Sequence, residues 1–169
     1  KVLDSLTRLR EWGTVPMEPI LLVLVQSWRD PDTEFNSEDL VGTLGLLESF
    51  VVRRFICQVP PNDLRSIFAR VTQQLKARNG QGILSSLESA LFEKNRRWPD
   101  DKAVLEAFAS VPLYRSPGQK QTFYILKQIA EKLEGKECPR ITFGTASNDF
   151  SIEHVLPQTL PEKWKKDLR

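Results

Sequence analysis

Apolar residues recur at helical spacing through most of the chain, and Pro, Gly and Asn residues separate one periodic segment from the next. The longest stripe has an apolar residue at every third or fourth position: Leu40, Leu44, Leu47, Val51 and Phe55. Asn36 stands where an N-cap would lie, Asp39 is its acidic partner, and Pro60-Pro61 ends the stripe. The pattern therefore predicts one long helix between Asn36 and Pro60.

Further helices are predicted on both sides of this one. The run Ile20–Val25 has no polar break and follows Pro16 and Pro19, which predicts a buried central helix that closes near Trp28. Apolar stripes and cap residues predict four more helices: 64–75, 83–91, one after the cap Asp100, and one from Ser116 to Gly135. Residues 1–135 are therefore predicted to form a helical domain, a multi-helix bundle of mainly α fold class.

The helical period stops after Gly135. Residues 150–156 are rich in β-forming side chains, and Pro157 prevents them from continuing as a central strand. The segment that follows, 159–162, is similar to a capping box and opens a basic helix. We therefore expect a second, short, β-containing domain over residues 136–169, and we expect it to be incomplete.

Composition excludes several classes of protein. With 40% hydrophobic and 27% charged residues, the chain is neither a disordered nor a low-complexity protein. The net charge of +2 requires neither a nucleic-acid nor a membrane partner. The longest apolar run, Ile20–Val25, is far below the roughly 20 residues of a membrane span, and no secretory leader opens the sequence. A cytoplasmic location without a membrane partner is therefore expected.

Two cysteines, Cys57 and Cys138, lie far apart and outside any metal-binding spacing. Two free thiols are expected in a reducing compartment, and a disulfide between them is the alternative. A metal site built on these cysteines is not expected.

His154 is the one histidine of the chain and the main candidate for chemistry. A lone histidine is more often structural, but Glu153 precedes it and Pro157 fixes the chain shortly after it. A basic segment then follows: Lys163, Lys165, Lys166 and Arg169. A neutral imidazole can take a proton from water near pH 7, and an adjacent carboxylate can hold a divalent ion beside a phosphate.

The spacing of these two residues poses a geometric condition. Adjacent side chains of a regular strand point to opposite faces of the sheet. Glu153 and His154 therefore serve one centre only if the backbone twists there, or if the ion and the attacking water lie on different sides of the strand edge.

The string Ser-Ile-Glu-His-Val-Leu-Pro-Gln over residues 151–158 resembles the opening strand of HNH nucleases, which are also called ββα-metal or His-Me finger nucleases. It resembles more closely the C-terminal nuclease domain of GmrSD-type restriction endonucleases, in which a Trp follows, here Trp164. Pro157 and Gln158 belong to the same motif. Four upstream strings resemble landmarks of the helical region before that nuclease: 47–57, 97–100, 112–114 and 124–126. With these strings, the resemblance covers residues 40–169.

The resemblance implies a DNA endonuclease of bacterial anti-phage defence, which hydrolyses a phosphodiester with one Mg²⁺ or Mn²⁺ ion and restricts modified DNA. His154 would be the general base and Glu153 the first metal ligand. Lys163, Lys165 and Lys166 would contact DNA phosphates, although a solvated helix face explains them as well.

The sequence also departs from the family pattern. A His-Me finger needs a second strand and a helix with an Asn, usually in a Gly-Asn-Leu-Thr-like string, and the residues after His154 contain none. The N-terminal domain of the family, which is linked to nucleotide hydrolysis and recognition of modified DNA, is missing as well. The segment alone is therefore expected to be inactive and to hold no metal firmly.

A second hypothesis explains most of the chain without catalysis. The helices carry no polar constellation, so the alternative interpretation is a noncatalytic interaction or scaffold module. Arg53 and Arg54 are expected to stabilise the helical layer rather than contact nucleic acid, because one can face solvent while the other reaches a buried carboxylate. The tryptophans Trp12, Trp28 and Trp98 are expected to be packing anchors, since no basic residues alternate with them.

Overall fold

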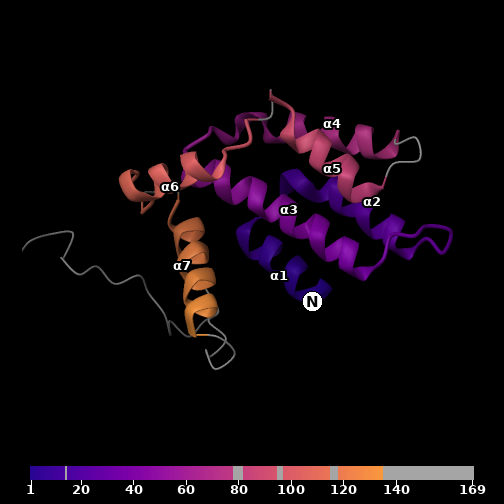
Figure 1. Cartoon of the computed structure of the whole chain (residues 1–169), viewed down its shortest axis with the longest axis horizontal. Helices are drawn as coiled ribbons and strands as arrows, with labels where there is room; N and C mark the ends of the chain where they lie inside the picture. Colours follow the sequence, from indigo (N-terminus) through magenta and orange to yellow (C-terminus); the bar gives the residue numbers. More distant parts are fainter. Residues whose placement is uncertain (14, 78–81, 95–96, 115–117, 135–169) are drawn as a thin grey trace, which may run out of the picture. The chain divides into compact units, whose positions relative to one another are not determined.

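The computed structural model describes residues 1–13, 15–77, 82–94, 97–114 and 118–134. These residues contain seven α-helices and no strand (Figure 1). The helices are α1 (Val2–Trp12), α2 (Glu18–Arg29), α3 (Ser37–Ile56), α4 (Leu64–Lys76), α5 (Ile83–Phe92), α6 (Asp101–Ser110) and α7 (Gln119–Glu134), with 3₁₀ turns η1 (Val15–Met17) and η2 (Pro61–Asp63). The mainly α prediction is confirmed for this part of the chain. The predicted β-containing segment, residues 136–169, lies outside the described residues.

The chain divides into two compact units, Lys1–Tyr124 and Ile125–Arg169. The described part of the second unit is the C-terminal portion of α7, up to Glu134. The predicted domain boundary after residue 135 remains a prediction, because the residues beyond it lie outside the described part.

Helix α3 is the centre of the first unit (Figure 1). Helices α1, α2, α5 and α6 pack against it, and α4 packs against α2 and α5. Four side chains of α3 are completely buried at this centre: Leu40, Leu44, Leu47 and Phe50. Each such burial contributes about 1.5–3 kcal/mol relative to an exposed side chain, so that this one helix supplies much of the core.

The ends of α3 lie where the sequence predicts them. The Asn36 side chain accepts hydrogen bonds from the backbone of Glu38 and Asp39, and the Asp39 carboxylate accepts one from the Asn36 N–H at 3.1 Å. This reciprocal capping box satisfies donors that the first helical turn leaves without partners. Two glycines lie within α3: a Cβ on Gly45 would meet nothing within 4 Å, and one on Gly42 would make ordinary contact with Leu84 at 3.9 Å.

Helix α2 differs from the prediction in its surroundings. Its bounds fit the predicted helix, but only one face is buried, with Ile20, Val23 and Leu24 inside and Leu22 63% exposed. The expectation of a buried central helix is therefore wrong, because α3 takes the centre and α2 packs mainly against α3 and α4.

Helix α6 begins at the predicted cap, where the Asp100 carboxylate accepts a hydrogen bond from the Ala103 N–H at 2.8 Å. None of the residues of α6 is buried, and its apolar residues Leu105 and Phe108 are exposed. Helix α7 likewise buries Phe123 but exposes Leu126 and Leu133. The residues Ser116 and Pro117, predicted to start α7, lie outside the described part.

Candidate functional site

The predicted catalytic segment lies outside the described residues. This applies to the whole candidate set: Glu153, His154, Pro157, Gln158, Lys163, Trp164, Lys165 and Lys166. Among the residues that the structure does describe, no group of three or more His, Cys, Asp or Glu side chains is arranged to hold a metal ion. The described helices offer two other polar centres and one cavity, all within the first unit.

The first polar centre surrounds Arg53 near the end of α3. Its guanidinium donates hydrogen bonds to the Ser49 hydroxyl at 3.0 Å, to the Pro99 carbonyl at 3.2 Å and to the Asp101 carboxylate at 2.5 Å. The same guanidinium lies 5.6 Å from the ring centroid of Trp98. One side chain thus connects α3 with the segment that leads into α6.

Trp98 anchors this segment to the core as well. Its ring stacks on Phe50 at a centroid distance of 5.7 Å and meets Phe92 edge to face at 4.5 Å. Such aromatic pairs contribute about 0.5–1.5 kcal/mol beyond the burial of their surface. The prediction that Trp98 is a packing anchor is confirmed, and Trp12 is one too, since it packs on Phe55 and Tyr124. Trp28 is 38% exposed and donates a hydrogen bond to Ser37 instead.

The neighbouring Arg54 points into the protein. Its side chain is 2% exposed, donates a hydrogen bond to the Pro60 carbonyl at 2.9 Å and forms an ion pair with Asp63. Burial lowers the pKa of Arg54, and the charge and hydrogen bond of Asp63 partly oppose this effect. The expected structural role of the two arginines is confirmed, but Arg53 is only 25% exposed and the carboxylate that Arg54 reaches is 36% exposed rather than buried.

The second polar centre surrounds Glu48 in the middle of α3. Its carboxylate accepts hydrogen bonds from the Arg8 side chain at 3.0 Å and from the Tyr124 hydroxyl at 2.5 Å. Burial and the negative charge of Glu48 raise the pKa of Tyr124 far above its usual value. For Arg8, burial lowers the pKa, but the hydrogen bond and charge of Glu48 outweigh it and raise the pKa overall. This centre connects α1, α3 and the start of α7.

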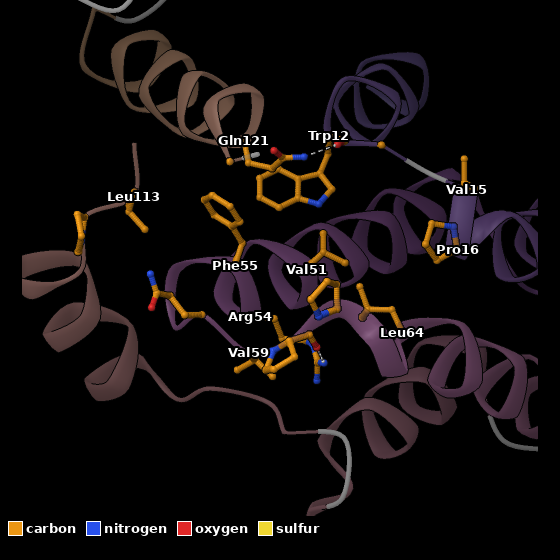
Figure 2. A pocket seen from close by; sticks show the side chains of 16 residues that line it. Trp12, Val15, Pro16, Val51, Arg54, Phe55, Val59, Leu64, Leu113 and Gln121 are labelled. Carbon is orange, nitrogen blue, oxygen red and sulfur yellow. Dashed lines mark hydrogen bonds between the residues drawn. The ribbon is translucent and has the colours of Figure 1, made fainter. Parts of the chain in front are cut away.

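A cavity of about 640 Å³ lies beside the end of α3 (Figure 2). Most of its lining is apolar, with aromatic, aliphatic and proline side chains, as Figure 2 shows for Trp12, Phe55, Val51 and Leu64. Its polar lining residues are Arg54, Gln58 and Gln121. Gln121 belongs to α7 and donates a hydrogen bond to the Trp12 carbonyl at 3.4 Å. The cavity therefore joins residues from opposite ends of the first unit.

Gln58 lines the cavity in an unusual backbone conformation. Its φ angle is +53°, and its N–H binds the Phe55 carbonyl while the Val59 N–H binds the Arg54 carbonyl. These two hydrogen bonds form a Schellman motif, in which the left-handed position is usually glycine. Gln58 has no signal in the sequence, because Pro60-Pro61 marks the end of the helix but not which residue adopts the left-handed conformation.

Cys57 is half-buried and forms no disulfide within the described part of the chain, and Cys138 lies outside that part. Burial and the nearby Asp100 raise the pKa of the Cys57 thiol, whereas Arg53 opposes them. A thiol with a raised pKa is a poor nucleophile. No described helix has the length and hydropathy that a membrane span requires.

Comparison with known proteins addresses the second half of the chain. No curated protein and no solved structure matches it. Residues 98–169 match a family model described as GmrSD restriction endonucleases, C-terminal domain. The match begins at Trp98, beside the Arg53 contacts, and includes the Glu153-His154 string. The resemblance inferred from the sequence is thereby confirmed: residues 98–169 are similar to the C-terminal domain of GmrSD restriction endonucleases.

Proposed function

We propose that this chain is part of a DNA endonuclease of bacterial restriction, with its catalytic residues in the segment around His154. The observation that carries the proposal is the family match over residues 98–169, which includes the Ile-Glu-His-Val-Leu-Pro-Gln string. A histidine beside a carboxylate, followed by a basic segment, is the side-chain chemistry that phosphodiester hydrolysis uses.

In this proposal His154 is the general base. Its neutral imidazole accepts a proton from a water molecule, the resulting hydroxide attacks phosphorus, and the bond to one ester oxygen of the DNA backbone breaks. A positioned base contributes on the order of 10²- to 10⁴-fold to such a rate.

Glu153 is the residue that would hold the divalent ion. A carboxylate is a ligand that suits Mg²⁺ or Mn²⁺, which bind proteins through few carboxylates and complete their shell with water and phosphate oxygens. When bound, the ion would supply positive charge beside the phosphate.

The helical layer would hold the start of the matched region in place. Trp98 and Asp101, at the start of the matched region, are fixed to α3 through Arg53, and Trp98 is fixed to the core through Phe50. This arrangement favours a positioning role for residues 1–97, with no direct contact to the reaction.

The test is DNA cleavage in Mg²⁺ or Mn²⁺ by the full reading frame that carries this chain, on modified and unmodified substrates. We expect His154→Ala to reduce the rate on the order of 10²- to 10⁴-fold, and His154→Gly to regain activity when imidazole is added. Glu153→Gln should raise the concentration of ion needed, whereas its control, Glu106→Gln on the exposed surface of α6, should not. Full activity of His154→Ala would eliminate the proposed base and favour the noncatalytic scaffold.

The three lysines are tested by DNA binding. If Lys163, Lys165 and Lys166 contact phosphates, replacing each by Gln makes the negative slope of log affinity against log salt shallower by about 0.9 for duplex DNA. An unchanged slope in all three variants would assign them to a solvated helix face.

A further inference from the structure

The cavity beside the end of α3 takes no part in the proposed cleavage, and it has the properties of a small-molecule site. Its volume of about 640 Å³ lies within the range of ligand pockets, which combine apolar walls with a few convergent polar groups. Apolar walls and polar side chains are both present among the described lining residues.

The walls are made largely of rings. Trp12 and Phe55 meet edge to face at a centroid distance of 5.5 Å, and Figure 2 shows both at the cavity wall. Four prolines complete the ring surfaces: Pro16, Pro60, Pro61 and Pro112. Aromatic and proline rings present flat apolar surfaces, which stack on a flat ligand ring at a low cost in side-chain entropy. The walls therefore favour a planar ring as ligand.

Two carboxamides supply the polar groups, Gln58 after α3 and Gln121 on α7. Gln121 uses one of its N–H groups on the Trp12 carbonyl, whereas the Gln58 carboxamide has no hydrogen-bond partner within the described part of the chain. A carboxamide offers donor and acceptor atoms side by side. It therefore pairs best with a ligand edge that carries one donor and one acceptor.

The backbone of Gln58 adds an independent argument. A side chain at φ +53° is strained relative to glycine, which normally fills this position of a Schellman motif. A strained residue that lines a cavity points to a function of its side chain. Glycine at this position would have no side chain, whereas Gln58 places a carboxamide at the cavity.

The charge of the lining excludes an anionic ligand. Arg54 is the one ionisable residue among the described lining residues, and its charge is balanced by Asp63 while it also binds the Pro60 carbonyl. A phosphate placed here would find no cation left to neutralise it. The ligand is therefore neutral.

We propose that this cavity binds a neutral heteroaromatic ring with an amide-like edge, the chemistry of a nucleobase, with the ring against Trp12 and Phe55 and the edge at Gln58 and Gln121. Such a ring can come from a free nucleoside or from an unpaired base of a nucleic-acid strand. The proposal goes beyond the proposed cleavage and does not depend on it, because binding is measured without catalysis.

The experiment uses the complete chain and the four deoxynucleosides, with saturation-transfer NMR for contact and calorimetry for affinity. We expect transfer to the base protons of at least one nucleoside, and no gain in affinity for its 5′-monophosphate. Gln58→Ala and Gln121→Ala should each weaken binding about 3- to 10-fold, the loss of one neutral hydrogen bond. Gln74→Ala, which removes a carboxamide bonded to Glu93 outside the cavity, is the matched control and should bind normally.

Gln58 and Gln121 both lie at the protein surface, one exposed and one half-buried, so their variants should fold, and circular dichroism will verify this. If a single-stranded oligonucleotide binds more tightly than the nucleoside, the ligand is a base within a strand. If the oligonucleotide binds more weakly, the ligand is the free nucleoside. The proposal is overturned if no nucleoside shows transfer at millimolar concentration, or if both glutamine variants bind as the parent does. Binding of a proline-rich peptide in place of the nucleosides would overturn it too and make the cavity a peptide site.

Discussion

Replacing Asp63 by alanine removes the carboxylate that pairs with the buried guanidinium of Arg54. The Arg54 side chain is 2% exposed and Asp63 36% exposed, and the hydrogen bond from Arg54 to the Pro60 carbonyl stays in place. Breaking a fully buried ion pair costs about 3–5 kcal/mol, and water can approach a partly exposed site. We therefore expect Asp63→Ala to lower the free energy of unfolding by about 2–3 kcal/mol.

The matched control removes the carboxylate that pairs with Arg53, the residue before Arg54 in α3. Arg53 pairs with Asp101, whose side chain is 84% exposed, so that Asp101→Ala removes the same kind of carboxylate from an adjacent arginine. Exposed ion pairs contribute about 0.2–1 kcal/mol, and the acidic residue also favours the N-terminus of α6 by a similar amount. We expect a loss near 1 kcal/mol, well below that of Asp63→Ala.

The assay is urea denaturation of the complete chain, followed by far-ultraviolet circular dichroism. In thermal denaturation of the same variants, a loss of 2–3 kcal/mol would lower the melting temperature by roughly 5–10 °C for a chain of this size. The double variant Asp63→Ala, Arg54→Met should regain part of the loss, because no charge is then buried. If Asp63→Ala costs no more than Asp101→Ala, or if the double variant is less stable than the single one, the reasoning from burial is wrong.

Three further variants test other features of the fold. Gly45→Ala should raise the free energy of unfolding by about 0.5–1 kcal/mol, because the added Cβ meets nothing within 4 Å in the middle of α3; a destabilised variant in urea denaturation would contradict this. Gln58→Gly should stabilise the chain by about 1 kcal/mol by the same measurement, since φ is +53°, while it weakens nucleoside binding. Tyr124→Phe should destabilise by about 1.5–3 kcal/mol at pH 7 through the lost hydrogen bond to Glu48. Because the pKa of Tyr124 is raised in the folded state, this difference should be complete below the pKa of an unfolded tyrosine, about 10, and should shrink above it; a difference that grows with pH would refute the assigned cause.

Local sequence signals predicted most of the helical layer. The capping box at Asn36, the cap at Asp100 and the breaks at proline gave the bounds of α3 and α6, because capping depends on residues three positions apart. The burial of individual faces was harder to predict. The apolar run of α2 does not distinguish a central helix from one that leaves Leu22 in solvent, because that depends on which neighbours pack against it.

The two candidate sites also differ in how far the sequence predicts them. The Glu153-His154 string is a local motif, and the family match over residues 98–169 covers it. The ring-lined cavity has no local signature, because Trp12, Phe55 and Gln121 come from three helices. The sequence argument treated Trp12 as a packing anchor only, and it is one, but its ring also lines a cavity.

What the sequence by itself determined is the described helices other than α1, the caps at Asn36 and Asp100, and the motif that relates the C-terminal part to a nuclease family. Each of these depends on residues within one or two helical turns, where backbone geometry fixes which side chains meet. Only the tertiary structure decided that Arg54 is buried beside Asp63, that Glu48 joins Arg8 to Tyr124, and that Gln58 and Gln121 line one cavity. These contacts join residues up to 76 positions apart, and they depend on how the helices pack around α3.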